Sequence, residues 1–553
     1  MPRLKQVLQL FKNHCNIMHQ FDIAKDYRML KSNFSFLRET PGQSTGKKVL
    51  IVSLTHFLYQ VKEEAMFAKA LQLQGCEITV LTYKHCIWPQ KYFRLFGITK
   101  FIFFEDYLIN VNNGDVERAA NDFLQKQISF QEVKKWQFKD CHIGQQVLSS
   151  FARRMHGTPN LLLPHVYNVF SFLLHDEIKT VFASDLLLDE MRPDILIFNE
   201  AKGSVYGGIS DLAFSKHMDC IQFVQPLHDD AVVLKRFDNE SMGSHPNSLS
   251  KSTFERIKAM SWSQGQEREV FNEFEKRYKG EWFLSQRNQI GTEKKSREQI
   301  IEQLGLDPQK KTAVVFSHIL WDANLFYGDD LFEDYEEWFI ETIQAAVENP
   351  NVNWIIKLHP GNVWKRNREK ISGELREITL IREKVGELPK HVYLLHPDTD
   401  INTLSLFEIA DYGITVRGTT GMELPCFGKQ MFTAGTGRYS GFGFTVDSDS
   451  PEQYLDNLKH IHEFSQLTVE QALLAKKHAY SIFNLRLWSM RSFKAEFNYG
   501  KKGTHPLDHD LQPRIESYDE LRKAEDLKRF SDWVLHNHEN DYLKDTISLI
   551  CVG

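Results

Sequence analysis

The residues best suited to chemistry lie between positions 411 and 447 of this 553-residue chain. Residues 412–416 are apolar and predict a buried strand, and a short helix is predicted to end at Gly428. Between them lies a turn of small and polar residues: Arg417, Gly418, Thr419, Thr420 and Gly421. At a strand–turn–helix junction, free backbone N–H groups and the positive end of the helix dipole point to one place. We therefore expect the turn to bind an anion, such as a nucleotide phosphate or a carboxylated sugar.

Polar side chains also follow two other predicted strands of the same region. Ser317 and His318 end one apolar run, and Lys357 and His359 end another. The carboxyl ends of parallel strands meet at one edge of a sheet, so we expect these four residues to lie beside the turn. With Arg417 they supply hydroxyl, imidazole and cationic groups, a set suited to a nucleotide. A single histidine at a strand end is equally compatible with a structural role.

Two residues of the predicted short helix are informative. Glu423 would accept hydrogen bonds from both ribose hydroxyls of a nucleotide sugar. As an alternative, Glu423 is only a first-turn acid that the helix dipole stabilises. Pro425 lacks a backbone N–H, which predicts that the helix begins late, near Gly421, or kinks there.

Composition and charge exclude several classes of function. The net charge of −6 lacks the basic excess of a general nucleic-acid surface. The seven cysteines are scattered and form no CxxC pair, which predicts reduced thiols in a cytoplasmic protein rather than disulfides or a zinc site. No apolar run approaches the roughly 18 residues of a membrane span.

The N-terminal 21 residues lack the continuous apolar core of a secretory signal. Apolar and basic side chains alternate there at helical spacing: Leu4, Lys5, Val7, Leu8, Phe11 and Lys12. This spacing predicts a helix packed on its own domain. The alternative is a weak interfacial anchor, which would bring the protein to the inner face of a membrane.

The order of predicted elements indicates an α/β protein with two Rossmann-like, doubly wound domains that face a cleft. We expect a helical N-terminal extension (1–45), a first Rossmann-like domain with a helical insertion (46–290), a second one (291–480) and a helical tail (481–553). Ligands of open α/β sheets bind at the carboxyl ends of the strands, so the cleft between the two domains is the expected site.

The segment KLHP and the run TTGMELPCFGKQMFTAGTGRYSGFGFT resemble the capsule polysaccharide synthesis family. That family is similar to glycosyltransferases of the two-domain GT-B fold, several of which transfer Kdo from CMP-Kdo. The matching positions are Thr420, Gly421, Glu423, Gly428, Lys429 and residues 439–443. The resemblance implies a glycosyltransferase without a cofactor. It would move a sugar from a nucleotide donor, CMP-Kdo among them, to a capsular or other surface polysaccharide at the capsule assembly machinery.

The chain departs from the family where a strand runs into an acidic pair and a glycine. Here that point reads Gln225-Pro226-Leu227, and the acid Asp229 comes later. Glu200 ends a neighbouring predicted strand, and His56 follows the first strand of the chain. The candidates for the catalytic group are therefore Asp229, Glu200 and His56, in that order. Each is equally compatible with a solvated loop.

Two acidic motifs have simpler explanations than metal binding. Asp398 and Asp400 imitate a DxD motif, but Asp400 is expected to cap a helix over 401–409. Residues 329–337 are expected to form a solvated acidic helix face. The GT-B architecture requires no metal, because helix dipoles and basic side chains stabilise the leaving group.

Two other functions stay open. The first is a nucleotide-sugar 2-epimerase of the same fold, whose helix shares the acid, proline and Gly-Lys order seen at Glu423, Pro425 and Gly428-Lys429. This chain lacks the doubled glutamate and the Ser-Gly-Gly turn of such enzymes. The second is a non-catalytic glycan-binding or export protein that kept the fold and lost the chemistry.

Overall fold

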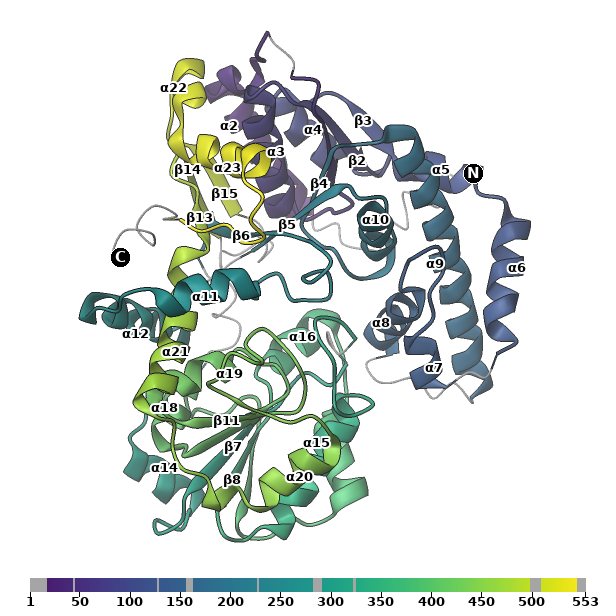
Figure 1. Ribbon diagram of the computed structural model, residues 1–553. Helices are drawn as coiled ribbons and strands as arrows, with labels where there is room; N and C mark the ends of the chain where they lie inside the picture. The colour runs from purple at the N-terminus through teal and green to yellow at the C-terminus, as the bar shows by residue number, and fades with distance from the viewer. Residues whose placement is uncertain are drawn as a thin grey trace.

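The computed structural model describes residues 17–42, 45–126, 129–155, 163–225, 228–281, 291–321, 325–497 and 509–544. The helix expected around Leu4 to Phe11 lies outside these ranges. The chain forms two α/β domains, each built on its own sheet, with the second domain below the first in Figure 1. Both domains are Rossmann-like and face a cleft, as the sequence predicted.

The first sheet has seven strands in the order β13-β6-β5-β4-β1-β2-β3. The five strands from β5 to β3 run parallel, while β6 pairs antiparallel with β5 and β13. Strand β1 is apolar from its second residue onward, as expected for a parallel strand covered on both faces. The strands are β1 (Lys48–Val52), β2 (Glu77–Thr82), β3 (Phe101–Phe103), β4 (Ile195–Phe198), β5 (Asp219–Val224), β6 (Ala231–Arg236) and β13 (Leu487–Ser489).

Helices cover both faces of the first sheet. One apolar cluster joins the sheet to α3 and α4 and to the C-terminal helices, and another joins it to the helical insertion and α10. The insertion after β3 agrees with the predicted helical region. The helices are α2 (Ile17–Asn33), α3 (Leu58–Leu73), α4 (Ile87–Leu95), α5 (Phe104–Asn110), α6 (Asn113–Leu124), α7 (Phe130–Lys134), α8 (Ile143–Met155), α9 (Pro164–Met191) and α10 (Ser204–Ser215).

The second sheet is entirely parallel, in the order β12-β11-β10-β7-β8-β9. Its five longer strands coincide with the five predicted ones to within three residues at each end. They are β7 (Thr312–Phe316), β8 (Asn353–Lys357), β9 (Val392–Leu395), β10 (Tyr412–Thr415) and β11 (Gln430–Thr433), followed by the short β12 (Val446–Asp447).

Helices of the second domain show how the sequence sets their ends. Ser296 and Gln299 form the predicted capping box of α14 (Arg297–Leu304), which ends at left-handed Gly305. The expected cap at Asp400 is wrong, because α18 (Thr403–Ile409) begins later and Asn402 caps it. The remaining helices are α15 (Tyr335–Glu348), α16 (Gly361–Glu369), α17 (Arg376–Leu380) and α20 (Pro451–Lys459).

Pro425 interrupts the short helix as predicted. Helix α19 (Thr420–Glu423) covers four residues, and a 3-10 turn (Leu424–Phe427) carries Pro425 before the chain turns at left-handed Gly428. A proline in this first turn leaves no backbone hydrogen bond unmade. The helix is therefore very short, which limits its dipole.

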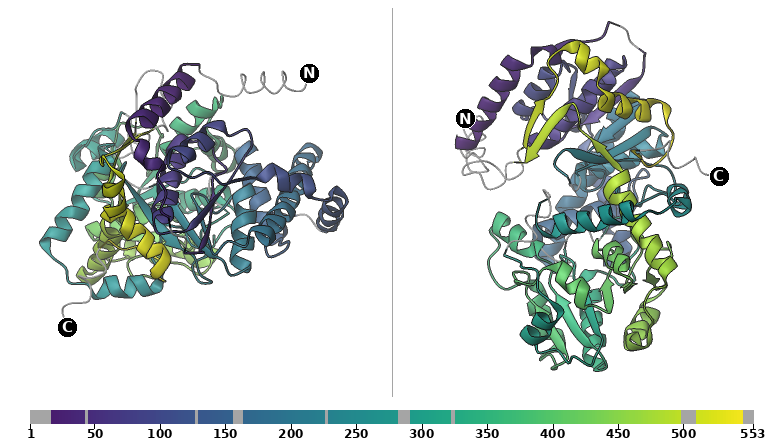
Figure 2. Two further views of the ribbon diagram at one scale, coloured as in Figure 1. Left: turned by 90° about the horizontal axis from the view of Figure 1, so that it is seen from above. Right: turned by 90° about the vertical axis from the view of Figure 1, so that its left-hand side faces the viewer.

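Three helices connect the domains, and the tail returns to the first one. Helices α11 (Lys251–Ala259), α12 (Gln264–Tyr278) and α21 (Val469–Tyr480) lie between the two sheets (Figure 1). The tail contains helices α22 (Tyr518–Lys523) and α23 (Glu525–His536), and α23 packs on α3 (Figure 2). It also adds β13 and the hairpin of β14 (Phe493–Phe497) and β15 (His509–Pro513), strands that the sequence analysis did not predict. In the described part of the chain, no helix combines the length and apolar character needed to cross a membrane.

Candidate functional site

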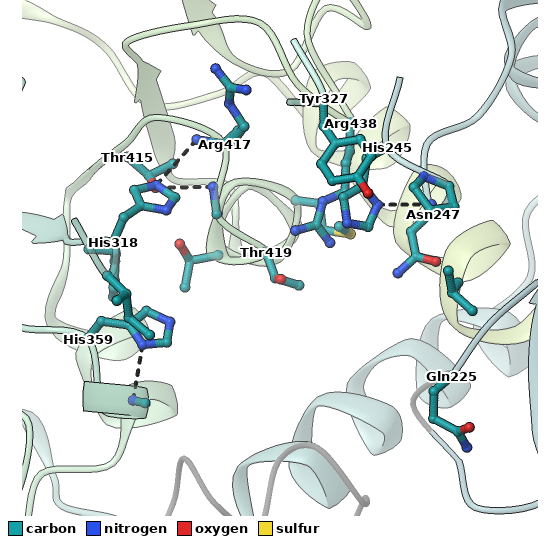
Figure 3. A pocket seen from close by; sticks show the side chains of 18 of the residues that line it. Gln225, His245, Asn247, His318, Tyr327, His359, Thr415, Arg417, Thr419 and Arg438 are labelled. Carbon is teal, nitrogen blue, oxygen red and sulfur yellow. Dashed lines mark hydrogen bonds between the residues drawn. The ribbon is translucent and has the colours of Figure 1, made fainter. Parts of the chain in front are cut away.

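A cleft of about 670 Å³ lies between the two domains, at the carboxyl ends of both sheets. This volume is typical of a ligand site (about 300–1,000 Å³). Figure 3 shows side chains of both domains converging on it. Eight of the residues proposed from the sequence line the cleft: Glu200, Ser317, His318, Lys357, His359, Arg417, Thr419 and Thr420. Four do not: His56, Asp229, Gly421 and Glu423.

The turn before α19 is packed against a tyrosine. The hydroxyl of Tyr439 donates to the carbonyl of Gly418 at 2.8 Å, and the N–H of Gly421 donates to the same carbonyl at 2.9 Å. A Cβ at position 421 would lie 1.9 Å from the Tyr439 hydroxyl oxygen. Gly421 is therefore required for close packing beneath the turn. Its N–H is already bonded, so the side chains around the turn must contribute most of the attraction for an anion.

Lys357 is the cation best placed for that role. It ends β8, lines the cleft and is only 5% exposed. Within the described ranges, no carboxylate forms an ion pair with it, and burial lowers the pKa of its ammonium to about 8. A buried ammonium without a counter-charge is costly in the empty protein and gains most from an incoming anion. Lys357 is therefore a candidate for binding an anion.

The two arginines on this rim have different roles. Arg417 forms an ion pair with Asp330 and donates to the carbonyl of Phe326 at 2.8 Å, so its charge is largely satisfied within the protein. Asp330 is 3% exposed, and the expectation of a solvated acidic face is wrong at this residue. Arg438 also lines the cleft, and burial beside Arg277 lowers the pKa of its guanidinium. Sequence analysis missed Arg438, although it lies directly before the aromatic–glycine loop at 439–443.

Three histidines in the cleft each have one ring nitrogen engaged by a backbone N–H. His318 Nε2 accepts from Val416 at 3.3 Å, His359 Nδ1 from Gly361 at 3.0 Å, and His245 Nδ1 from Asn247 at 3.0 Å (Figure 3). An imidazole nitrogen that accepts a hydrogen bond carries no proton, so the other nitrogen of each ring bears it. In His318 and His245 the other ring nitrogen therefore carries the N–H.

Burial and nearby positive charges keep two of these rings neutral. Burial, then His359 and Arg417, lowers the pKa of His318 well below its usual value. Burial and Arg438 do the same for His245. The cleft also contains two buried hydroxyl oxygens, Ser317 Oγ and Thr420 Oγ1, that have no hydrogen-bond partner in the part of the chain that the structure describes. These groups give the second-domain wall neutral donors beside its cations, a combination that suits phosphate and ribose oxygens.

Glu423 is placed differently from the ribose-binding role considered above. It is fully buried, and its two carboxylate oxygens accept hydrogen bonds from Arg277 and Tyr278 of α12. Arg277 and Tyr278 themselves line the cleft. In this arrangement Glu423 joins α19 of the second domain to the connecting helix α12. Arg277 and Tyr278 are separated from Glu423 by 146 and 145 residues in the sequence, so no local sequence pattern could indicate these hydrogen bonds.

Among the described residues that line the cleft, Glu200 of the first domain is the one that carries a carboxylate. It follows β4, and burial raises the pKa of its carboxyl, with Arg153 and the hydroxyl of Tyr327 opposing that effect. Asp229, placed first from the sequence, accepts from the backbone N–H of Phe497 at 3.1 Å, away from the cleft lining. His56 is exposed. Pro226 and Leu227, part of the departure from the family pattern, lie outside the described residues.

Asp400 of the DxD-like segment is engaged elsewhere. It forms an ion pair with Lys295 and accepts from Gln303 at 3.1 Å. Lys295 precedes α14 and Gln303 lies in its last turn, and neither Asp398 nor Asp400 lines the cleft.

Comparison with family models and with curated proteins finds no match for this chain. Solved structures that resemble it include the beta Kdo 2,4 transferase KpsC of Thermosulfurimonas dismutans (12% identity, 60% of this chain and 87% of that one, TM-score 0.29). Others are the UDP-GlcNAc 2-epimerase of Neisseria meningitidis bound to UDP-GlcNAc (11%, 79% and 96%, TM-score 0.25) and Anabaena HepE in complex with UDP (10%, 79% and 95%, TM-score 0.27). These TM-scores are low, so the two-domain fold is assigned from the two sheets described above.

Proposed function

We propose that this protein is a glycosyltransferase of the GT-B type that moves a sugar from a nucleotide-activated donor to a glycan. The observation that carries the proposal is the opposition of two groups across one cleft. Lys357 is a buried cation without a carboxylate partner in the described ranges, and Glu200 is a carboxylate with a raised pKa on the other domain. A phosphate-binding group facing a base is the minimum that sugar transfer requires.

In the proposed reaction, the donor phosphate lies against Lys357 and Arg438. Glu200 takes the proton from an acceptor hydroxyl, whose oxygen forms a bond to the anomeric carbon. The bond between that carbon and the donor phosphate oxygen breaks, and its electron pair leaves with the nucleotide. The two cations stabilise this negative charge, a role that needs no metal ion. A base with a raised pKa is suited to proton transfer near neutral pH.

The sugar donor is proposed first as a general class and then as a particular compound. The cationic wall and the neutral histidine donors support a nucleotide-linked sugar in general. The narrower proposal, CMP-Kdo with a capsular or other surface polysaccharide as acceptor, depends on the sequence resemblance. Cytoplasmic location with peripheral contact at the inner membrane, or with the capsule assembly machinery, is likewise proposed from the sequence.

The first experiment identifies the nucleotide. Thermal unfolding of the protein is measured with CMP, UDP, CDP and GDP, since a ligand that binds only the folded state raises the melting temperature with its saturation. We expect one of the four to give a clear rise. If none of them shifts the melting temperature at millimolar concentration, the proposed nucleotide site is wrong.

The second experiment tests the chemistry with Glu200→Gln. Removing a general base costs about 10²–10⁴-fold in rate, so donor turnover should fall by that factor while nucleotide binding is kept. Asp229→Asn, which changes a carboxylate outside the cleft lining, is the matched control and should turn over donor normally. If turnover survives Glu200→Gln, the assignment of Glu200 is wrong.

A third experiment distinguishes the transferase from a nucleotide-sugar 2-epimerase. The protein is incubated with UDP-GlcNAc alone, and epimerisation without an acceptor would exclude the transferase.

A further inference from the structure

The first-domain wall of the cleft differs in chemistry from the wall opposite. Besides Asn247, which precedes α11, four amide side chains lie on it: Gln60 from α3, Asn199 after β4, Gln222 in β5 and Gln225 after β5. We call these four residues the amide wall. The opposite wall contributes Lys357 and the other cationic side chains of the second domain. One cleft therefore has a cationic side and a side lined by neutral dipoles.

Hydrogen bonds within the amide wall fix how two of the amides are turned. Gln222 Nε2 donates to the backbone carbonyl of Asn199 at 2.9 Å. A carbonyl only accepts, so the amide oxygen of Gln222 must point elsewhere. This oxygen is buried and has no hydrogen-bond partner among the described residues, and the residue is 1% exposed. A buried acceptor left unpaired costs stability unless a ligand supplies a donor.

Gln225, three residues further along the chain, is also held through its amide nitrogen. Oriented to satisfy its surroundings, its amide nitrogen donates to both carboxylate oxygens of Glu63, at 2.9 and 3.1 Å. Glu63 is fully buried in α3 behind the cleft, and burial raises the pKa of its carboxyl well above the usual value. In that orientation the amide oxygen of Gln225 is the end that remains for the cleft. Gln225 in this orientation presents an acceptor to the cleft, whereas the amide oxygen of Gln222 has almost no exposed surface.

Charges nearby do not convert this wall into an anion site. The first domain, with its connecting helix α12, contributes three cations to the cleft lining: Arg153, Lys202 and Arg277, the last of which is paired with Glu423. Lys202 is ion-paired with buried Asp211 at 3.1 Å, and Arg153 acts on Glu200. An anionic ligand on the amide wall would face carbonyl oxygens, whose partial charges repel it. A ligand rich in O–H groups would instead donate to them.

We propose that the amide wall binds the neutral, hydroxyl-rich face of the acceptor, that is, an uncharged sugar unit at the growing end of a glycan. This inference depends on the proposed transferase function and specifies the acceptor class for it. Buried acceptors matched to hydroxyl groups also give specificity, because an analogue without the hydroxyl leaves them unpaired. Glu200 directly follows Asn199 in the chain, which places the proposed base beside the hydroxyls that the wall would hold.

The test is ligand-observed saturation-transfer NMR on the full chain, with maltotriose and methyl β-galactoside as neutral probes and glucuronic acid as the anionic probe. Glucuronic acid is tested on Lys357→Met, which removes a second-domain cation; we expect the neutral probes to bind and glucuronic acid not to. Gln222→Met and Gln225→Met remove one acceptor each at similar volume and should weaken neutral-sugar binding about fivefold to tenfold. Gln309→Met, at an exposed position outside the cleft, is the matched control and should leave binding unchanged.

Thermal shift by the nucleotide, measured on the same variants, separates this inference from the proposed function. Nucleotide binding should survive both cleft substitutions, which also shows that the variants fold. If nucleotides bind but neutral sugars do not, or if glucuronic acid binds better, the amide wall assignment is overturned alone. If nucleotides fail to bind the unchanged protein, the transferase proposal fails whatever the sugars do.

Discussion

The hydroxyl of Tyr327 donates a hydrogen bond to Glu200 Oε1 over 3.3 Å, joining the second domain to the first across the cleft. Tyr327 has a backbone φ of 72°, a left-handed conformation that is uncommon for a tyrosine and persists where the surroundings enforce it. Arg417 enforces it by donating to the carbonyls of Phe326 and Gly328, on either side, at 2.8 and 3.3 Å. The orientation of the proposed base is thereby coupled to the proposed phosphate turn.

Removing this hydroxyl should change the chemistry without emptying the nucleotide site. In Tyr327→Phe, the Glu200 carboxylate loses a donor that lowers its pKa, so the pKa should rise further. The rising acid limb of the pH–rate profile should move to higher pH, so turnover should fall on that limb and change least at high pH. The measurement is donor turnover from pH 5 to 9, with nucleotide affinity determined in parallel.

A matched tyrosine is available as the control for that experiment. Tyr393 donates to the carbonyl of Gly305 at 2.8 Å and does not line the cleft, so Tyr393→Phe removes a hydroxyl of the same kind elsewhere. Its pH profile should match that of the unchanged protein. An unshifted acid limb in Tyr327→Phe would mean that the tyrosine does not set the protonation of the base.

Lys357 should show a trade between stability and binding. Burial lowers its pKa from 10.5 to about 8, which makes the charged form costly in the empty folded state. Lys357→Met keeps the length without the charge and should stabilise the free protein at pH 7 by roughly 1–3 kcal/mol. The same change should weaken nucleotide binding at least tenfold, as measured by calorimetry.

The pH dependence of binding gives the sign of the Lys357 effect. The ammonium is charged below about pH 8 and loses its proton as the pH rises through that value, so nucleotide affinity should decline between about pH 7.5 and 9. A bound anion raises this pKa and moves the decline upward. Lys357→Met should remove most of the decline, whereas Lys384→Met at an exposed position should keep it. A flat affinity profile in the unchanged protein would contradict the assignment.

Local patterns were sufficient for much of the second domain. The buried strands of a parallel sheet are continuous apolar runs, and the Ser296 capping box and Gly305 mark both ends of α14. Ser317 and Lys357 follow such runs, so their position at the carboxyl edge followed from the strand assignments alone. Sheet topology therefore placed most of the predicted donor residues on one rim.

Partners from distant parts of the chain account for what the sequence did not predict. Glu423 is paired with Arg277 and Tyr278 of another helix, and Asp330 with Arg417, so their local patterns gave the wrong environment. Asp229 lies close to an apolar strand end, but an antiparallel strand follows and its carboxylate accepts from Phe497 of the tail. The tail strands are short, and their pairing is visible only once the first sheet has formed.

The tail is fixed to the first domain by a buried carboxylate between two cations. Asp541 accepts from Lys235 at 2.8 Å and lies 3.2 Å from Arg486, with all three side chains fully buried. Asp541→Asn would leave both cations without a counter-charge, which should lower the free energy of unfolding by about 3–5 kcal/mol. Urea denaturation at pH 7 measures this loss. Asp532→Asn, which breaks the exposed pair with Lys528, should change it by less than about 1 kcal/mol.

Acid should weaken the same cluster in a defined pH range. Arg486 and Lys235 lower the pKa of Asp541 from 3.8 to about 2, against the effect of burial. A depressed carboxyl pKa contributes stability that is present above pH 3.8 and lost as the pH falls through about 2. The stability difference between the unchanged protein and Asp541→Asn should therefore shrink at low pH. A difference that stays constant down to pH 2 would contradict this account.

Glu64 should make the first domain less stable as the pH rises. The side chain is fully buried in α3, and burial raises the pKa of its carboxyl from 4.5 to about 8, against a smaller opposing effect of Ser53. A raised carboxyl pKa contributes stability that is fully present below pH 4.5 and lost as the pH rises through about 8. Glu64→Gln does not titrate and resembles the protonated form. The variant should therefore match the unchanged protein near pH 5 and exceed its stability at pH 8.5 by roughly 2–5 kcal/mol.

Urea denaturation at both pH values measures the difference, with Glu117→Gln on the exposed face of α6 as the control. Equal stability of Glu64→Gln and the unchanged protein at pH 8.5 would show that the carboxyl ionises freely, and so that α3 opens to water at that position.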